Sequence, residues 1–595
     1  MFQSFETLAS PEHGAGRLAQ LRAALKKADV QGLIVPRADV HQGEYVAERD
    51  QRLQWLTGFT GSAGLCVVLP DVAGVFVDGR YRTQVKSQVD LAHFTPVDWP
   101  ETQPGDWIKA HLTTGRIGYD PWLHTPAEVQ KIEDALAATG VKILPAPNFI
   151  DQIWADQPAA PQGKAFVHPL EFAGESHADK RARMAAELAA AGQGACVITL
   201  PDSLCWLLNI RGADVPRNPV MLGLAILHAD GRLDLFADAA KFDDALLAHL
   251  GPDVTLHAPD ALLDGLSRVQ GKIRLCKKTA PLAVGRHLTQ NKIPFDWGDD
   301  PCQMAKACKN AAEIEGMRSA HLRDAVAMVE FLAWLDGASD LTEIAVAQKL
   351  EGFRRATNAL HDLSFDSIVG SGPNGAIMHY RVTEDTNRPI GENELLLVDS
   401  GGQYVDGTTD ITRTVARGDP GQEARECYTR VLQGTIAISR LRFAKGRAGR
   451  DLDGFARWPL WQAGMDFDHG TGHGVGAFLS VHEGPQRLSY TSDVPFRAGM
   501  ILSNEPGYYR EGEFGIRLEN LIVVVDAPPM GDHRPQLAFE TLTWVPFDRR
   551  LVVVDMLTAG ERDWLNSYHA EVRARLEVRV SAGAVEWLRA ATAGV

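Results

Sequence analysis

Five side chains that can ligate metal ions lie between residues 399 and 519 of the chain. They are four carboxylates and one imidazole, namely Asp399, Asp410, His473, Glu505 and Glu519. A single divalent ion needs fewer protein ligands than this, whereas two ions that share carboxylates need about this many. The set therefore indicates a dinuclear metal site.

The two aspartates lie on either side of a predicted turn. Residues 395–399 are apolar up to the first aspartate, Ser-Gly-Gly at residues 400–402 allows a turn, and a strand pattern resumes by residue 410. We predict a β-hairpin that brings Asp399 and Asp410 to a common point.

The other candidate ligands also lie on extended backbone. Residues 469–476 read His-Gly-Thr-Gly-His-Gly-Val-Gly, which is too rich in glycine for a stable helix. Pro506 fixes the backbone just after Glu505, and Glu519 follows a short strand. Each residue alone is explained by a turn or a satisfied polar group. Several carboxylates beside apolar strands are costly together, and metal coordination removes that cost.

Seven strings in the chain resemble the motifs of the Xaa-Pro aminopeptidases, or aminopeptidases P, a family of metallopeptidases with the pita-bread fold. The strings are Gly-Pro-Asn-Gly-Ala-Ile-Met-His379-Tyr, Val-Asp399-Ser-Gly, Gly-Thr-Thr-Asp410-Ile-Thr-Arg-Thr, His469-Gly-Thr-Gly-His473-Gly-Val-Gly, Val-His482-Glu-Gly-Pro, Asn-Glu505-Pro-Gly-Tyr-Tyr and Gly-Ile-Arg517-Leu-Glu519-Asn. The resemblance covers nearly the whole chain and is to the long form, in which two non-catalytic domains precede the peptidase domain.

The resemblance implies how the five ligands divide between two ions. Asp399 would chelate one ion, and Asp410 and Glu519 would bridge the pair. His473 and Glu505 would complete the second ion. A site rich in carboxylates, with one imidazole and no thiolate, favours hard or borderline ions. We expect Mn²⁺, as the resemblance also implies, although Co²⁺ or Zn²⁺ could occupy the same ligands.

The resemblance also assigns catalytic roles. His379, His482 and Arg517 match family residues that contact the substrate or the transition state rather than the metal. Glu505 would take a proton from the attacking water and pass it to the leaving nitrogen. Either histidine could hold the developing oxyanion or the scissile carbonyl.

The implied substrate is a peptide with proline in second place. The peptide bond between the first residue and the proline is a tertiary amide without an N–H, so a dedicated site must receive the pyrrolidine ring. The segment from His469 to Val481 offers apolar side chains between histidines, and we expect Val475, Ala477, Phe478 and Leu479 to form that wall.

The composition is that of a protein without nucleic-acid or membrane partners. The net charge is −16, from 60 Lys and Arg against 76 Asp and Glu, so phosphates would meet no cationic face. No apolar run approaches the ~18 residues of a membrane helix, and the polar start lacks the order of a signal peptide. The seven cysteines are scattered, which suits reduced thiols. We expect a cytoplasmic protein and, from the resemblance only, a homodimer.

The first half of the chain contains a repeat. A helical pattern at residues 17–25 leads to a strand beginning at Gly32 and then to Trp55, and the same order recurs from residues 180–188 to Gly194 and Trp206. One loop, at residues 39–50, is present only in the first copy. We infer a duplicated small α/β module.

The repeat, together with what the resemblance implies, predicts a mixed α/β and α+β chain of three domains. Two duplicated creatinase-N-terminal-like α/β domains would occupy residues 1–157 and 158–300, with a join rich in proline and glycine near residue 157. A pita-bread catalytic domain would occupy residues 301–595, with a C-terminal extension from about residue 547. Apolar residues at helical spacing between Ile314 and Leu335 predict a long helix against the sheet that carries the ligands.

Three alternatives share parts of this pattern. A prolidase, which cleaves Xaa-Pro dipeptides, has the same fold and ligands, but the duplicated front module favours an aminopeptidase P. A creatinase-like hydrolase does not keep this set of metal ligands. A non-catalytic peptide-binding module on a pita-bread domain should have lost ligands, whereas here all five are present.

Overall fold

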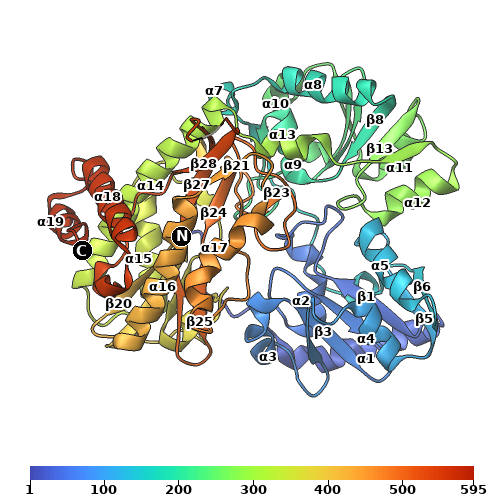
Figure 1. Cartoon of the computed structure of the whole chain (residues 1–595). Coiled ribbons are helices and arrows are strands. Elements are labelled where there is room, and N and C mark those ends of the chain that lie inside the picture. The colour runs from blue at the N-terminus through green and yellow to red at the C-terminus, as the bar shows by residue number, and fades with distance from the viewer. Residues whose placement is uncertain (532) are drawn as a thin grey trace. The chain divides into compact units, whose positions relative to one another are not determined.

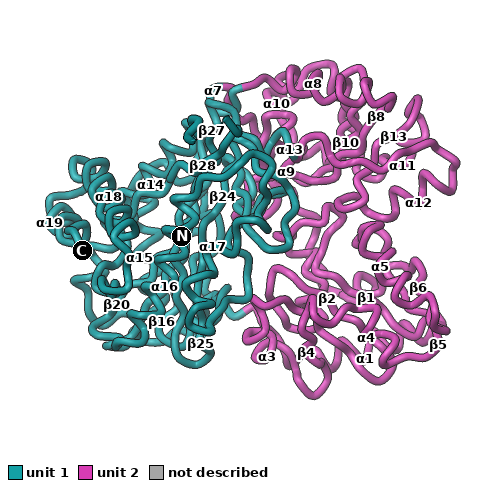
Figure 2. The backbone as a smooth tube through the Cα atoms, in the orientation of Figure 1, with its two compact units in different colours: residues 1–7, 171–174, 304–595 teal, residues 8–170, 175–303 magenta. Residues whose placement is uncertain are grey.

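The computed structural model describes residues 1–531 and 533–595. The chain divides into two compact units (Figure 2). Unit 1 comprises residues 1–7, 171–174 and 304–595, and unit 2 comprises residues 8–170 and 175–303. Among the described residues, no helix combines the length and the apolar character needed to cross a lipid bilayer.

Unit 2 contains two six-stranded sheets of one topology. The first has the order β4-β3-β2-β1-β5-β6, with β1 (Gly32–Pro36), β2 (Leu65–Val68), β3 (Ala73–Val77), β4 (Thr95–Asp98), β5 (Thr114–Tyr119) and β6 (Gly140–Pro145). The second has the order β12-β11-β10-β8-β13-β14, with β8 (Gln193–Ile198), β10 (Leu224–His228), β11 (Leu233–Phe236), β12 (Val254–His257), β13 (Lys272–Leu275) and β14 (Phe295–Trp297). The inner strands β1 and β8 each pair antiparallel with one neighbour and parallel with the other. The structure confirms the duplicated module.

Each module begins with a helix and continues through the tryptophan helix that the repeat predicts. The leading helices are α1 (Pro11–Lys27) and α8 (His177–Ala190), and the tryptophan helices are α2 (Arg52–Thr57) and α9 (Pro201–Leu208). In α1, Leu18, Leu21 and Leu25 are buried at helical spacing, so one face packs inward. The Ser176 hydroxyl caps α8 by accepting from the backbone of residue 179. The two modules also contain α3 (Gln84–Gln88), α4 (Pro104–His111), α5 (Pro126–Leu136), α6 (Phe149–Ile153), α10 (Asp244–Leu250), α11 (Leu262–Leu266) and α12 (Leu282–Gln290). The short helix α7 (Leu170–Ala173) lies between them in sequence, and residues 171–174 belong to unit 1.

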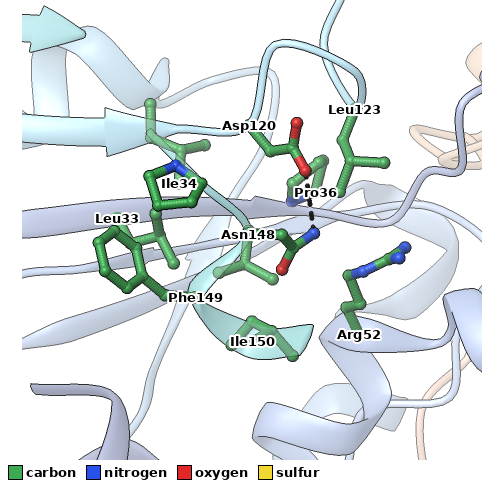
Figure 3. Close-up of a pocket in the computed structure, with 11 residues that line it drawn as sticks. Leu33, Ile34, Pro36, Arg52, Asp120, Leu123, Asn148, Phe149 and Ile150 are labelled. Carbon is green, nitrogen blue, oxygen red and sulfur yellow. Dashed lines mark hydrogen bonds between the residues drawn. The ribbon is translucent and has the colours of Figure 1, made fainter. Parts of the chain in front are cut away.

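A small cavity in the first module lies beside the ends of β1 and β5 (Figure 3). Its polar lining groups have partners within the chain. Asn148 donates to Asp120 at 3.0 Å, and Arg52 binds Asp151 through two nitrogens at 2.6 and 2.9 Å. Since these groups are already paired, the cavity offers no free charge to a ligand.

Unit 1 is built on antiparallel sheets. The largest has the order β21-β28-β27-β24-β22-β23, with β21 (Arg442–Ala444), β22 (Gly472–Gly474), β23 (Glu483–Leu488), β24 (Ile501–Asn504), β27 (Asn520–Ala527) and β28 (Gln536–Thr541). A second has the order β16-β17-β20, with β16 (Ile368–Ser371), β17 (Glu394–Ser400) and β20 (Ile411–Arg417). A ribbon joins β25 (Gly507–Arg510) to β26 (Phe514–Arg517).

The predicted hairpin is confirmed and carries an unpredicted insertion. Strands β17 and β20 pair antiparallel, with Asp399 opposite Thr412. The chain between them belongs to a small sheet of β15 (Asp362–Leu363), β18 (Gly402–Tyr404) and β19 (Gly407–Thr408). Asp410 stands at the entrance to β20, so the hairpin sets both aspartates at one end of the pair.

Helices pack on the strands of unit 1 (Figure 1). The predicted long helix is α14 (Ala311–Gly337), in which Met317, Met328 and Leu335 are buried. The other α-helices after residue 300 are α13 (Pro301–Ala307), α15 (Glu343–Arg355), α16 (Gln422–Ser439), α17 (Gly449–Trp461), α18 (Ala559–Leu576) and α19 (Ala582–Ala591). The C-terminal helices bury Leu565 and Leu588 in the same core as α14. The boundaries proposed at residues 157 and 300 stay a prediction.

Candidate metal centre

The candidate ligands meet where several strands of unit 1 end. Asp399 lies near the end of β17, Asp410 before β20, His473 in β22, Glu505 after β24, and Glu519 between β26 and β27. Single ligand atoms of Asp410, His473 and Glu519 lie within 4.8 Å of one another. His473 Nε2 is 3.3 Å from Glu505 Oε1 and 3.5 Å from Asp410 Oδ2. The structure thus brings four of the five predicted ligands into one cluster.

Asp399 is held by Arg517 and interacts with the cluster through its charge. The guanidinium donates to Asp399 Oδ2 at 2.6 Å, and both side chains are buried. The negative charges of Asp410 and Glu505 also act on the Asp399 carboxylate. All five residues predicted as ligands therefore share one electrostatic environment.

A glycine allows the ligand strands to approach this closely. A Cβ at Gly472 would lie 1.9 Å from the backbone carbonyl oxygen of Ser503, so only glycine lets β22 lie against β24 here. The Ser503 hydroxyl accepts from the backbone N–H of His473 at 2.9 Å and donates to Glu505 at 2.9 Å. One serine therefore aligns two candidate ligands.

The tautomer of His473 leaves its other nitrogen available to a cation. Nδ1 lies 2.9 Å from the carbonyl oxygen of Gly474, and because a carbonyl only accepts, Nδ1 carries the proton. Nε2 faces Asp410 and Glu505, where a metal ion would bind it in place of a proton.

Three of the carboxylates, Asp399, Glu505 and Glu519, have raised pKa values. Burial raises the pKa of Asp399 to about 6, against the opposing effect of Arg517. Burial also raises the pKa of Glu505, and burial with the charge of Asp410 raises that of Glu519 well above its ordinary range. Such shifts are expected where several carboxylates are buried close together.

The imidazole shows the opposite response. Burial acts to lower the pKa of His473, but the hydrogen bond with Asp410 and the charges of Glu505 and Asp410 outweigh it and raise the pKa to about 9. The cluster therefore attracts positive charge. A divalent cation among these side chains would satisfy that demand.

Two buried oxygens test whether metal ions fit the residues. Within the described chain, Asp399 Oδ1 and Glu519 Oε1 are buried and take part in no hydrogen bond. A buried carboxylate oxygen without a partner is costly, and metal coordination is one way to satisfy it. The carboxylate-rich set with one imidazole also has the ligand chemistry of hard or borderline divalent ions. The residues fit a metal centre.

Three supporting residues were missed by the sequence analysis. The Thr412 hydroxyl donates to Glu519 Oε2 at 2.8 Å, and Ser503 supports Glu505. Tyr509 bonds both Arg517, at 2.7 Å, and His469, at 2.9 Å. Each stands two or four residues from a ligand on extended backbone, and alternation of side chains along a strand would have placed it on the same side.

The two predicted catalytic histidines differ in how closely they approach the cluster. The ring of His482 packs edge to face with that of His473, with centroids 4.2 Å apart. His379 is half-buried in the turn after η5 (Gly372–Ala376), a 3₁₀ helix that packs against β17 and β26. Its role in the reaction stays a prediction.

Arg517 contacts Asp399 in the structure. The side chain is buried, and its nitrogens donate to Asp399, Thr412 and Tyr509. These contacts orient a candidate metal ligand. The predicted contact of Arg517 with substrate stays a prediction.

The apolar wall predicted for the proline ring is wrong for three of its four residues. Val475, Phe478 and Leu479 have at most 1% of their surface exposed. Val475 packs in a core with Met317 and Ile501, so its apolar character serves packing. The sequence pattern of a buried strand and that of a pocket wall are the same, which explains the error.

Family models match four stretches of the chain. Residues 17–153 and 156–313 each match the Creatinase/Prolidase N-terminal domain. Residues 315–526 match metallopeptidase family M24, and residues 535–595 match the C-terminal region of peptidase M24.

Proteins similar to this chain span nearly its full length. A probable Xaa-Pro aminopeptidase P of Coccidioides posadasii (strain C735) is 38% identical over 96% of this chain and 91% of its own. Aminopeptidase P2 of Arabidopsis thaliana is 39% identical over 91% of this chain and 83% of its own. The crystal structure of an X-prolyl aminopeptidase from Caenorhabditis elegans, described as a cytosolic enzyme with a di-nuclear active site, superposes with a TM-score of 0.93 at 34% identity. That alignment covers 98% of this chain and 100% of the other.

Proposed function

The chain belongs to the Xaa-Pro aminopeptidase P family, and on that premise we propose that it releases the first residue of peptides whose second residue is proline. The observation that carries this proposal is the cluster of Asp410, His473, Glu505 and Glu519. Asp399 shares its electrostatic environment, and two buried carboxylate oxygens, Asp399 Oδ1 and Glu519 Oε1, have no hydrogen-bond partner. Relatives named as aminopeptidases P match nearly the whole chain, which supports the activity.

Asp399, Asp410, His473, Glu505 and Glu519 would hold two divalent ions, and by the resemblance Asp410 and Glu519 would be ligands shared by both. Once bound, such a pair supplies a water whose pKa falls toward ~7 and an electrophile for the scissile carbonyl. Mn²⁺ is our first choice, because the ligand set is mostly carboxylate and contains no thiolate. Co²⁺ and Zn²⁺ are the alternatives.

The protein residues would move the proton and hold the substrate. Glu505, oriented by Ser503, would accept a proton from the attacking water and return it to the proline nitrogen. His379 and His482 would donate hydrogen bonds to the carbonyl oxygen as negative charge develops there. Arg517 and Tyr509 would keep Asp399 in place.

Preference for proline follows from the bond itself. The Xaa-Pro amide has no N–H and a fixed φ, so sites that anchor that N–H handle it poorly. A prolidase would accept the same bond only in a dipeptide. The second creatinase-type module and the full-length relatives favour the aminopeptidase. A non-catalytic binding module is disfavoured because the predicted ligands are all present.

One assay separates these functions. A tripeptide with proline second and an Xaa-Pro dipeptide would be incubated with the protein, with and without a chelator. We expect metal-dependent cleavage of the tripeptide and little cleavage of the dipeptide. Preferred cleavage of the dipeptide would assign a prolidase, and cleavage of neither, with peptide bound, would assign a binding module.

We further propose a cytoplasmic homodimer. The cytoplasmic location is supported by the scattered free cysteines and by the description of the C. elegans relative as cytosolic. The dimer is proposed from the family resemblance, and light scattering would test it against the chain mass of 64.9 kDa. The three-domain division, with boundaries near residues 157 and 300, belongs to the same proposal.

A further inference from the structure

The first seven residues belong to unit 1, although residues 8–170 belong to unit 2 (Figure 2). The matched family models begin only at residue 17. Within unit 1, residues 2–7 contact the segment from residue 364 to residue 388, which carries His379. Their position therefore bears on the catalytic half of the chain.

Backbone atoms of the N-terminal residues are held by this segment. Arg381 donates through two nitrogens to the carbonyl oxygens of Ser4 and Glu6, each at 2.8 Å. The backbone N–H of Glu384 donates to the carbonyl oxygen of Phe5 at 2.8 Å. Three successive carbonyl groups are thus bound by residues within five positions of His379.

Residues 2 and 3 are held by buried side chains and backbone groups of unit 1. The Gln3 amide exchanges two hydrogen bonds with the backbone of Ser367, at 2.9 and 3.2 Å. The backbone N–H groups of Phe2 and Gln3 donate to the Glu351 carboxylate at 2.8 and 3.3 Å. Gln3 and Glu351 are both buried, so these hydrogen bonds hold the N-terminal residues in one position and are not exposed surface contacts.

The Phe5 side chain packs against apolar residues of the segment that carries His379. It packs on the apolar cluster of Ile368, Tyr380, Val382 and Leu397, which Tyr509 also touches. Tyr380 directly follows His379, and Tyr509 bonds Arg517 and His469. Phe5 is half-buried, so removal of its ring takes away one side of the packing around these neighbours and lets them shift.

The His379 segment depends on such contacts because no strand ladder fixes it. Residues 377–391 contain neither helix nor strand. On the inner side, the Glu343 carboxylate accepts from the backbone of Ser371, the Asn374 amide and the Tyr380 hydroxyl, at 2.8 to 3.0 Å. Residues 2–7 supply the outer side.

We propose that residues 2–7 form a strap that positions His379, acting through Phe5 and Arg381. The proposal rests on the catalytic role assigned to His379 under the proposed function. Phe5 and Arg381 are positioning residues, because their described contacts are with the strap, the apolar cluster and the His379 segment rather than with the metal ligands.

The test compares single variants of the 595-residue chain. Phe5→Ala and Arg381→Ala should lower kcat on a proline-second tripeptide by about 10- to 10²-fold, the larger value corresponding to a displacement of ~1 Å. Metal content should not change. Phe5→Leu should restore most of the rate because it refills the cluster. Leu8→Ala, which removes an exposed side chain just after the strap, is the matched control and should behave as the parent.

A double-mutant cycle separates positioning from general destabilisation. If Phe5 acts through His379, the variant Phe5→Ala with His379→Ala should be no slower than His379→Ala alone. Three results would overturn the strap proposal. They are a double variant whose loss in kcat is the product of the two single losses, a loss of metal in Phe5→Ala, and a parental kcat in both Phe5→Ala and Arg381→Ala. A parental kcat in His379→Ala would instead contradict the role of His379 in the proposed function, and the strap proposal would fall with it.

Discussion

Asp410 acts on every other member of the candidate metal centre. Its carboxylate lies 3.5 Å from His473 Nε2, and its charge raises the pKa of Asp399, Glu505 and Glu519. In the proposed function it bridges both ions. The residue is therefore the one whose removal should affect both ions together.

We predict that Asp410→Ala abolishes turnover and lowers the metal content from two ions per chain. Loss of a bridging carboxylate leaves each ion under-coordinated. Metal analysis of the purified variant by mass spectrometry decides this, with Asp419→Ala, an exposed position, as the control. Two ions per chain and normal turnover in Asp410→Ala would exclude the bridging role.

The Thr412 hydroxyl provides a finer test of the same centre. Thr412→Val keeps the shape of the side chain but removes the donor to Glu519 Oε2. Groups that orient metal ligands typically contribute 10- to 100-fold to metal affinity, so we expect a fall of about that size. Titration of the metal-free variant with Mn²⁺ measures it, and an unchanged affinity would show that Glu519 needs no such orientation.

His379 and His482 should give a different signature from the ligands. Alanine at either position is expected to leave the metal content unchanged and to lower kcat by about 10²- to 10³-fold, the usual cost of losing one donor to a developing oxyanion. Metal content and kcat would be measured on the same samples. A metal-free His379→Ala or His482→Ala would make that residue a ligand and change the five-member set.

At the scale of elements, the close contact between η5 and β26 sets the segment that carries His379 against the strand that carries Arg517. A Cβ at Gly515 in β26 would lie 1.7 Å from the carbonyl oxygen of Gly375 in η5. His379 follows four residues later, and Arg517 follows Gly515 by two. The two glycines therefore determine how closely the parts of the site can approach.

Gly515→Ala should separate these two elements. We expect a loss of about 1–3 kcal/mol in the free energy of unfolding, as for other overpacked sites, together with a fall in kcat. Chemical denaturation and steady-state kinetics would measure both. Gly352→Ala in α15 is the control, because nothing lies within 4 Å of its added Cβ. If Gly515→Ala matched this control in both measurements, the close contact would have no functional consequence.

The elements that periodicity describes were predictable from the sequence. The β17–β20 hairpin follows from an apolar run, a glycine turn and a second strand pattern, and α14 follows from apolar residues at helical spacing. The duplicated modules follow from recurrence of the same pattern. Each of these signals is local, so neighbouring residues are enough to carry it.

Elements held by distant contacts were not predictable. The strap at residues 2–7 has few apolar residues, and its partners lie more than 340 positions away. The small sheet formed by β15, β18 and β19 consists of strands of two or three residues, too short for a pattern. The wall expected from Val475 to Leu479 shows the converse, since an apolar sequence pattern alone does not distinguish core from pocket.

At the scale of the whole molecule, the candidate chemistry belongs to unit 1. All five predicted ligands, with His379, His482 and Arg517, lie between residues 304 and 595. In unit 2, the cavity of the first module (Figure 3) is lined by polar groups that are already paired. We expect the duplicated modules to shape access or association rather than to bind the catalytic ions.

The most direct test of the account compares two peptides that differ only at the second residue. Purified protein, stripped of metal and reloaded with Mn²⁺, would be given Arg-Pro-Pro and Arg-Ala-Pro at matched concentrations, and free arginine would be measured. We predict release from Arg-Pro-Pro, no comparable release from Arg-Ala-Pro, and none from either before metal is restored. Equal cleavage of the two peptides, or undiminished cleavage without metal, would contradict a dinuclear enzyme specific for proline in second place.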